Sequence, residues 1–281
     1  MRPIVLTAIV LAAGLGGINP TSAADLIGKC AMSGRKGDPA TLNAPAVAGQ
    51  LTVAVALPAP VWWNGSTPEA VKDGFEYCLA ANIAWRAGYD KLGVVDVPWD
   101  RLIHGEATGF DLALSEIAIT EERKKALAFS VPYLQSDFGV LIKPGTAVDE
   151  TTIKGLRLGV QDGTAAAAFA ESALKAPSVK VFAEPGELYT AVRSGQIDAA
   201  LTDAATALAE QGLEAGSLVM VGRYHGSTAL AAVYPKGSVN GPALDKIIAG
   251  LLADGTQTAL AKTYLWSVWG LDPESVGYFS P

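Results

Sequence analysis

One arginine of this sequence stands where a small anion is readily held. Residues 111–133 read as a short apolar strand, a polar turn, a charged helical segment and a second extended run, and Arg123 lies in the charged segment. A guanidinium group at a strand exit presents a planar fork of N–H donors that matches the two oxygens of a carboxylate. We therefore predict that Arg123 binds a carboxylate; the alternative is a surface arginine paired with Glu116 or Glu122.

Two further polar positions follow predicted strands later in the chain. Gly163 and Thr164 come after an extended run at 156–160 and start an alanine-rich helix, whose free N-terminal amides attract an anion. Asp203 follows the extended run 197–202, and a carboxylate inside a poorly solvated cleft binds a cation strongly. Each position has a structural alternative, because Thr164 and Asp203 also suit the capping position of the helix that follows.

The stretch around Arg123 resembles the solute-binding proteins of amino-acid ABC importers. In that family a strand, a turn of the form S-G-M-S-I-T-P-E-R and a run of the form F-S-x-P-Y build half of the ligand cleft. This chain has S-E-I-A-I-T-E-E-R at 115–123 and F-S-V-P-Y at 129–133, and the resemblance continues in order from about residue 51 to about residue 270. It implies a type II periplasmic binding fold, in which two α/β lobes close around a ligand by hinge bending.

The resemblance also implies which residues line the ligand cleft. Arg123 and the loop 163–165 would bind the α-carboxylate of an amino acid, and Asp203 would bind its α-ammonium group. Tryptophan side chains would supply aromatic walls, with ordinary core packing as the alternative for each of them. The full predicted set is Trp62, Trp63, Trp99, Ser115, Glu116, Ala118, Arg123, Gly163, Thr164, Ala165 and Asp203.

The chain departs from the family pattern at several cleft positions. Alanine replaces an aromatic or a hydroxyl residue at three of them, Ala59, Ala118 and Ala165. Glu116 replaces a glycine or serine, and a buried carboxylate there needs a partner. We expect Glu116 either to pair with Arg123 or to meet a cationic group of the ligand. Against a cationic ligand, Ala56 stands where binders of basic amino acids often hold an acid.

The hydrophobic pattern predicts two α/β units. Residues 51–56 and 93–97 read as strands separated by an amphipathic helix over 71–87, and a similar alternation restarts near residue 150. We expect two lobes, each a mixed sheet flanked by helices, with hinge crossings at 137–143 and 227–234. The expected division is a signal peptide at 1–24, an N-terminal extension at 25–49, lobe 1 at 50–138 plus 232–281, and lobe 2 at 142–228.

The N-terminus and the cysteines indicate export to the periplasm. Arg2 precedes an apolar stretch that is too short for a comfortable membrane span, and the small residues up to Ala24 offer a cleavage site. An uncleaved anchor is the alternative. Cys30 and Cys78 are the only cysteines, and in an exported protein we expect them to form a disulfide, with lipid attachment at Cys30 as the competing interpretation. No His or Cys spacing indicates a metal site.

Composition and motifs together favour a binding protein without a cofactor. The net charge of −7 argues against nucleic-acid binding, and 50% hydrophobic residues indicate a folded protein. We predict a monomer that captures an amino acid or related zwitterion and delivers it to an ABC permease. Two alternatives stay open. One is an enzyme on the same fold, although Thr206 stands where the similar cyclohexadienyl dehydratases have an acid; the other is a degenerate sensor or structural protein.

Overall fold

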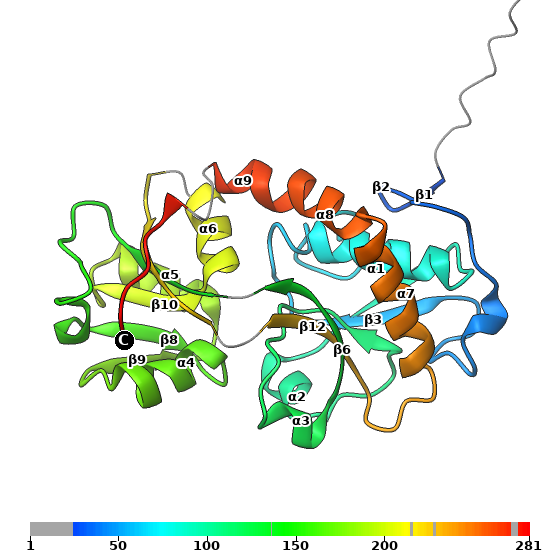
Figure 1. The fold of residues 1–281 in the computed structure, drawn as a ribbon, viewed down its shortest axis with the longest axis horizontal. Coiled ribbons are helices and arrows are strands. Elements are labelled where there is room, and N and C mark those ends of the chain that lie inside the picture. Colours follow the sequence, from blue (N-terminus) through cyan, green and yellow to red (C-terminus); the bar gives the residue numbers. More distant parts are fainter. Residues whose placement is uncertain (1–24, 136, 214–215, 227–228, 271–274) are drawn as a thin grey trace, which may run out of the picture.

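The chain folds into two α/β lobes that lie side by side in the computed structural model (Figure 1). The structure describes residues 25–135, 137–213, 216–226, 229–270 and 275–281. The predicted signal peptide at 1–24 lies outside these described residues. Within them, no helix is both long enough and apolar enough to cross a membrane.

Lobe 1 is built on a five-stranded mixed sheet. Its strand order is β4-β3-β5-β12-β6, with β3 parallel to β4 and β5, and β12 antiparallel to β5 and β6. The apolar β3 is buried along its whole length, as expected for a central strand covered on both faces. The strands are β3 (Leu51–Val55), β4 (Leu92–Asp96), β5 (Leu112–Ala113), β6 (Ala128–Gln135) and β12 (Ala229–Tyr234).

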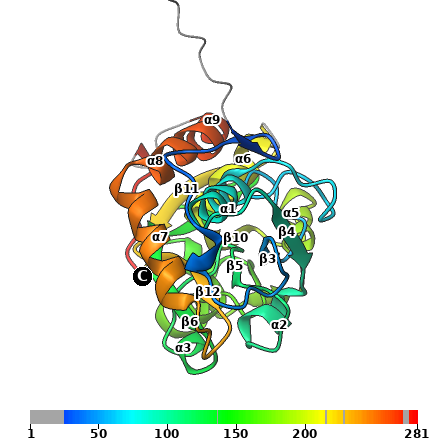
Figure 2. The ribbon, with the colours of Figure 1, turned by 90° about the vertical axis from the view of Figure 1, so that its right-hand side faces the viewer.

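The helices of lobe 1 cover this sheet. The long helix α1 is buried at almost every position because α7 and α8 pack against it, as the second view shows (Figure 2). The elements are a 3-10 turn (Pro39–Thr41), α1 (Phe75–Arg86), α2 (Trp99–Ile103), α3 (Arg123–Ala126), α7 (Gly241–Ala253), α8 (Thr256–Ala261) and a π-helical turn (Lys262–Trp266). The short α9 (Ser267–Trp269) follows this turn and packs against α6 (Ala204–Leu213) of lobe 2.

Lobe 2 repeats the plan with a second mixed sheet. Its strand order is β11-β7-β10-β8-β9, in which β8, β9 and β10 are parallel and β7 is antiparallel to both of its neighbours. The elements are β7 (Phe138–Ile142), a 3-10 turn (Ile153–Gly155), β8 (Leu158–Gln161), α4 (Ala165–Phe169), a π-helical turn (Ala170–Leu174), β9 (Val179–Phe182), α5 (Pro185–Arg193), β10 (Ala199–Asp203), α6 (Ala204–Leu213) and β11 (Val219–Tyr224).

The two predicted hinge crossings are mostly strands of the sheets. The crossing predicted at 137–143 contains β7, which is wholly buried in the sheet of lobe 2, and the crossing predicted at 227–234 contains β12, wholly buried in lobe 1. The chain therefore returns to the sheet of lobe 1 at Ala229, before the predicted boundary at 232. A continuous apolar run has the same pattern in a connector and in a central strand, so the sequence did not separate them.

The C-terminal tail corrects the predicted extent of lobe 1. The helices α7 and α8 pack on lobe 1 as expected, but residues 276–279 run beside β11 of lobe 2. Arg223 N donates to the carbonyl of Gly277 (2.9 Å), and Phe279 N donates to the carbonyl of Arg223 (2.7 Å). The Phe279 ring lies over Gly222, where a Cβ atom would come within 2.3 Å of it. Local sequence pattern does not show where such a tail docks.

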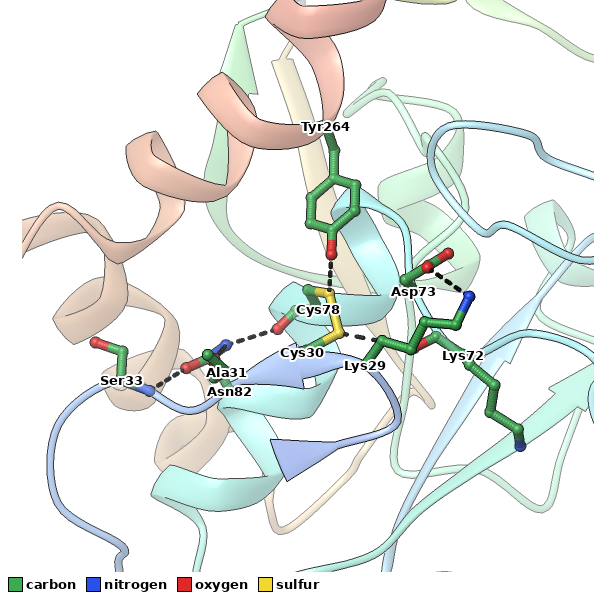
Figure 3. The surroundings of a disulfide bond; sticks show 9 residues. All are labelled: Lys29, Cys30, Ala31, Ser33, Lys72, Asp73, Cys78, Asn82 and Tyr264. Atoms are coloured by element: carbon green, nitrogen blue, oxygen red, sulfur yellow. Dashed lines mark hydrogen bonds and ion pairs between the residues drawn. A yellow bond between two sulfur atoms is a disulfide. The ribbon is translucent and has the colours of Figure 1, made fainter. Parts of the chain in front are cut away.

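The N-terminal extension is fixed to lobe 1 by the predicted disulfide. Cys30 lies in a small hairpin of β1 (Leu26–Ile27) and β2 (Cys30–Ala31), and it is bonded to Cys78 of α1 with a Cα–Cα distance of 5.4 Å. Figure 3 shows Asn82 of the same helix accepting a hydrogen bond from Ser33 N (2.8 Å), and the Tyr264 hydroxyl 3.1 Å from Cys78 Sγ. The extension is therefore packed against α1.

Removing this disulfide is expected to destabilise the protein. The bond closes a loop of 48 residues, for which the chain-entropy treatment gives about 4 kcal/mol. The double variant Cys30→Ala/Cys78→Ala should lose roughly this free energy of unfolding in urea titrations, and a reductant should change the wild-type protein but not the variant. A loss below about 1 kcal/mol would contradict a stabilising role for the disulfide.

Candidate functional site

A cavity of about 350 Å³ lies between the two lobes. Its walls come from the loops that follow the parallel strands β3, β4 and β5 of lobe 1 and β8, β9 and β10 of lobe 2. The carboxyl ends of parallel strands are the usual place for a ligand in open α/β sheets. The main lining segments are 56–59, 96–99, 115–118, 161–166, 184–185 and 202–206.

Arg123 lies in this cavity as a buried cation. Its side chain is held between the lobes, because Nη1 donates to the carbonyl of Ala118 in lobe 1 (2.8 Å) and Nη2 to the carbonyl of Gly163 in lobe 2 (2.9 Å). The guanidinium carbon lies 5.2 Å from the ring centre of Trp99, a cation–π arrangement. Only 7% of Arg123 is exposed. Burial lowers its pKa to about 10, so it keeps its charge at neutral pH.

The predicted anion loop faces Arg123 from lobe 2. Gly163 adopts a left-handed φ of +65°, and a Cβ atom there would come within 2.6 Å of Ile103 in lobe 1. Thr164 caps α4, because its Oγ1 accepts from Ala167 N (3.1 Å) and donates to the carbonyl of Gln161 (2.8 Å). The capping alternative therefore accounts for the Thr164 hydroxyl. Ala165 and Ala166 of the same first turn line the cavity, and their amides have no carbonyl partner within the helix.

Asp203 lines the cavity at the end of β10. Its Oδ1 accepts from Ala205 N (2.9 Å), so it also caps α6, as the structural alternative proposed. Thr206 follows one turn later in the same helix. Its hydroxyl donates to the Glu116 carboxyl group of lobe 1, which brings the first turn of α6 against the loop after β5.

Glu116 is joined to a fully buried carboxyl group that the sequence analysis did not identify. Glu76 of α1 accepts from Glu116 N (2.8 Å), from Trp63 Nε1 (2.8 Å) and from the Tyr133 hydroxyl. Burial raises the pKa of Glu76. Burial, together with the charges of Glu76 and Asp203, also raises the pKa of Glu116 well above its usual range. Glu116 forms no ion pair with Arg123, so this predicted pairing is wrong.

Of the three tryptophans predicted to line the cleft, one lies at the cavity and two lie in the core. Trp99 lines the cavity, and its Nε1 donates to the carbonyl of Asp162 in lobe 2 (3.1 Å). Trp62 and Trp63 are 1% and 0% exposed and lie outside the cavity, so the prediction of an aromatic wall is wrong for both. Trp62 packs edge-on against Phe75 of α1, which explains its burial in the core of lobe 1.

The remaining predicted residues lie at the cavity. Ser115 is buried, and its Oγ accepts from Ala56 N (3.1 Å), which ties the loop after β5 to the end of β3. Ala118 contributes its carbonyl to Arg123, and it forms an isolated bridge to Leu230. Ala59 also lines the cavity, so the three alanine departures leave space there that larger side chains would fill.

Three hydrogen bonds cross from one lobe to the other beside the cavity. They run from Arg123 to the Gly163 carbonyl, from Trp99 to the Asp162 carbonyl, and from the Thr206 hydroxyl to Glu116. All three lobe 1 residues lie in or directly after loops that follow parallel strands. The lobes therefore meet across the cavity through the same residues that would contact a ligand.

Two residues that sequence analysis did not identify hold the cavity loops in place from the core of lobe 1. Glu76 and Tyr133 lie in the core of lobe 1, and both are almost fully buried. An acidic residue inside the run F-E-Y-C-L-A-A-N-I-A-W was the available signal, because a charged group on a helix buried all round needs specific partners. The described residues contain no cluster of His, Cys, Asp and Glu side chains suited to a metal ion.

Comparisons with known proteins agree with this architecture. Residues 51–267 match the family described as bacterial extracellular solute-binding proteins, family 3. The L-cystine-binding protein of Escherichia coli (strain K12) is 26% identical over 196 residues, which cover 68% of this chain and 73% of that protein. The histidine-binding periplasmic protein of Salmonella typhimurium (strain LT2) is 26% identical over 211 residues, covering 70% and 81%.

A solved structure extends the likeness to three dimensions. An ancestral arginine-binding protein bound to glutamine has a TM-score of 0.68 and 26% identity to this chain, covering 78% of this chain and 98% of that one. The predicted type II periplasmic binding fold, with two lobes of mixed sheets flanked by helices, is thereby confirmed.

Replacement of Glu116 by glutamine is expected to change how stability depends on pH. The folded-state pKa of Glu116 is raised above its usual value of 4.5, so its contribution to stability is complete below pH 4.5 and is lost as the pH rises through the folded pKa. Relative to wild type, Glu116→Gln should therefore gain on the order of 1–3 kcal/mol between pH 4.5 and pH 8.

Urea unfolding of the ligand-free protein at the two pH values measures this difference. The exposed Glu187 offers a matched control, since Glu187→Gln makes the same chemical change outside the cavity and should stay within about 0.5 kcal/mol of wild type at both values. A Glu116→Gln variant whose difference from wild type is the same at pH 4.5 and pH 8 would contradict the assignment.

Proposed function

Because the chain belongs to the bacterial extracellular solute-binding proteins of family 3, we propose that it captures an amino acid or related zwitterion between its lobes. It then delivers this ligand to an ABC permease in the membrane. The similar proteins reported above are named for amino acids, L-cystine, histidine and arginine, which supports this class of ligand. The protein works in the periplasm as a monomer, after export directed by residues 1–24.

The buried charge of Arg123 is the observation that carries this proposal. A guanidinium group has five N–H donors and a fixed positive charge, and removing it from water is costly unless an anion accompanies it. Arg123 has two carbonyl partners but no ion pair with any carboxylate of the described residues. A ligand carboxylate supplies the missing negative charge, and the first-turn amides of α4 face the same space.

The other lining residues suit the rest of a zwitterion. Asp203 lies in the same cavity and binds the α-ammonium group, while Trp99 packs over the bound ligand. Both interactions gain strength when the lobes exclude water. The lobes open and close by bending where the chain passes between the two sheets, from β6 to β7 and from β11 to β12, so that a ligand enters and leaves.

Binding without catalysis is the simpler use of this cavity. The described lining residues include no histidine or cysteine, and Ser115 Oγ is occupied as an acceptor from Ala56 N. Thr206 stands where the cyclohexadienyl dehydratases have an acidic residue, and its hydroxyl group cannot take the role of that acid. We therefore propose a transport receptor rather than an enzyme, in agreement with the binding proteins that the chain resembles.

A thermal-unfolding screen against amino acids, betaines, polyamines and small carboxylates tests the proposed function. A ligand at about a thousand times its Kd adds roughly 4 kcal/mol, which raises the Tm by very roughly 8–16 °C in a protein of this size. Arg123→Ala should abolish the shift for every ligand that carries a carboxylate. Arg101→Ala, which removes an exposed arginine of α2 outside the cavity, should leave the shift unchanged.

Two outcomes would contradict the proposal. The first is a mature protein, freed of any co-purified ligand by unfolding and refolding, that shows no shift with any amino acid in the screen. The second is an Arg123→Ala variant that is folded and still binds the same ligands with wild-type affinity, because the carboxylate would then be held elsewhere.

A further inference from the structure

We propose that Glu116 selects ligands carrying a second positive charge, so that the cavity takes cationic amino acids in preference to neutral ones of the same shape. This inference rests on the function proposed above and deepens it. It assigns to Glu116 the side-chain cation of the ligand, at the end of the cavity that Thr206 and Asp203 form.

The charges that line the cavity are the first argument. Four lining residues carry carboxyl groups, and Arg123 is the single cationic lining residue among those the structure describes. A neutral amino acid adds one positive and one negative charge, so it leaves this acidic excess unchanged. A ligand with an additional ammonium or guanidinium group offsets one further carboxylate. The four acidic lining residues are Asp96, Glu116, Glu184 and Asp203.

The position of Glu116 among these four is the second argument. Asp96 and Glu184 are exposed at the edge of the cavity, where water screens their charge. Glu116 lies deeper, between the lobes, where its Oε2 accepts from the Thr206 hydroxyl. Its Oε1 accepts no hydrogen bond from any described residue, and this oxygen is not among the fully buried polar atoms. One oxygen of a deeply placed carboxyl group is therefore available to a ligand donor.

The absence of a protein cation beside Glu116 is the third argument. In the described part of the chain its carboxyl group forms no ion pair, and the Arg123 nitrogens donate to carbonyl groups instead. Burial beside Glu76 and Asp203 raises the pKa of Glu116, which favours the protonated form in the empty cleft. A ligand cation takes the place of that proton and restores the carboxylate, because an opposite charge nearby favours ionisation.

The local backbone holds Glu116 toward the cleft. Its φ of +52° is in the left-handed region, which a residue with a Cβ atom seldom adopts, and Glu76 accepts the N–H of this residue. Glu76 is in turn held by Trp63 and Tyr133, so the carboxyl group of Glu116 is aimed by a buried network. We regard Glu76 as a positioning residue, since it touches the backbone of Glu116 and not the cavity.

A competing arrangement uses the same residues. In it, Glu116 and Asp203 together surround the α-ammonium group. Glu116 then strengthens the binding of all amino acids equally. Asp203 ends β10 and already accepts a hydrogen bond from the amide of Ala205, whereas Thr206, which donates to Glu116, lies in the first turn of α6. The two arrangements differ in one measurable respect, because only a side-chain cation site discriminates a charged ligand from its neutral isostere.

Titration calorimetry with two isosteric pairs, arginine against citrulline and lysine against 2-aminoheptanoate, tests the proposal. Wild-type protein should bind the charged member of at least one pair on the order of 10- to 100-fold more tightly, the effect of one charge-assisted hydrogen bond. Glu116→Gln should lower this preference, taken as the ratio of the two Kd values in each pair, to within about threefold of one. The distant control Glu187→Gln should retain the preference.

Glu116→Gly provides a second variant that guards against a folding defect. Glycine adopts a positive φ without strain, so this variant should fold at least as well as wild type and should also lose the preference. The proposal is overturned if wild type shows no preference, if both Glu116 variants keep it, or if both weaken neutral and charged ligands equally. The proposal is also overturned if wild type binds none of these four ligands but binds another amino acid in the thermal-unfolding screen, whereas binding of no amino acid at all would overturn the proposed function itself.

Discussion

The structure depends on one buried positive charge placed between two lobes. Arg123 lies where the loop after β5 meets the loop after β8, and its guanidinium group donates to one carbonyl from each lobe. Carbonyl groups satisfy some of its donors but do not neutralise its charge. Gly163 lets the second lobe approach this closely, because a Cβ atom there would strike Ile103. The same guanidinium thus joins the lobes and, in the proposed function, binds the ligand carboxylate between them.

The acidic side of the cleft is organised from the core of lobe 1. The buried carboxyl group of Glu76 accepts three hydrogen bonds from protein donors in place of water. The donors are Trp63, Tyr133 and the backbone of Glu116. A buried carboxyl group with complete hydrogen bonding can fix a loop in one conformation. Here it fixes the left-handed turn that carries Glu116 to the boundary with lobe 2. Helix α1 therefore links core packing to the ligand selectivity that we propose for Glu116.

Local pattern was enough for the fold and for much of the site, but not for what long-range packing decides. The T-x-E-R turn at Arg123, the helix start at Thr164 and the strand end at Asp203 are local features, and the structure brings all three to one cavity. The burial of Trp62 and Trp63 depends on helix α1, which no spacing reveals. The docking of Phe279 on lobe 2 likewise depends on contacts distant in sequence.

A crystal structure of the protein with a bound amino acid tests the central claim most directly. The account predicts a carboxylate within about 3 Å of the Arg123 nitrogens, which is the usual distance for a charge-assisted hydrogen bond, and an α-ammonium group at Asp203. The ligand would lie between the lobes beside Trp99. A ligand bound outside this cavity, or one whose carboxylate is held by residues other than Arg123, would contradict the account.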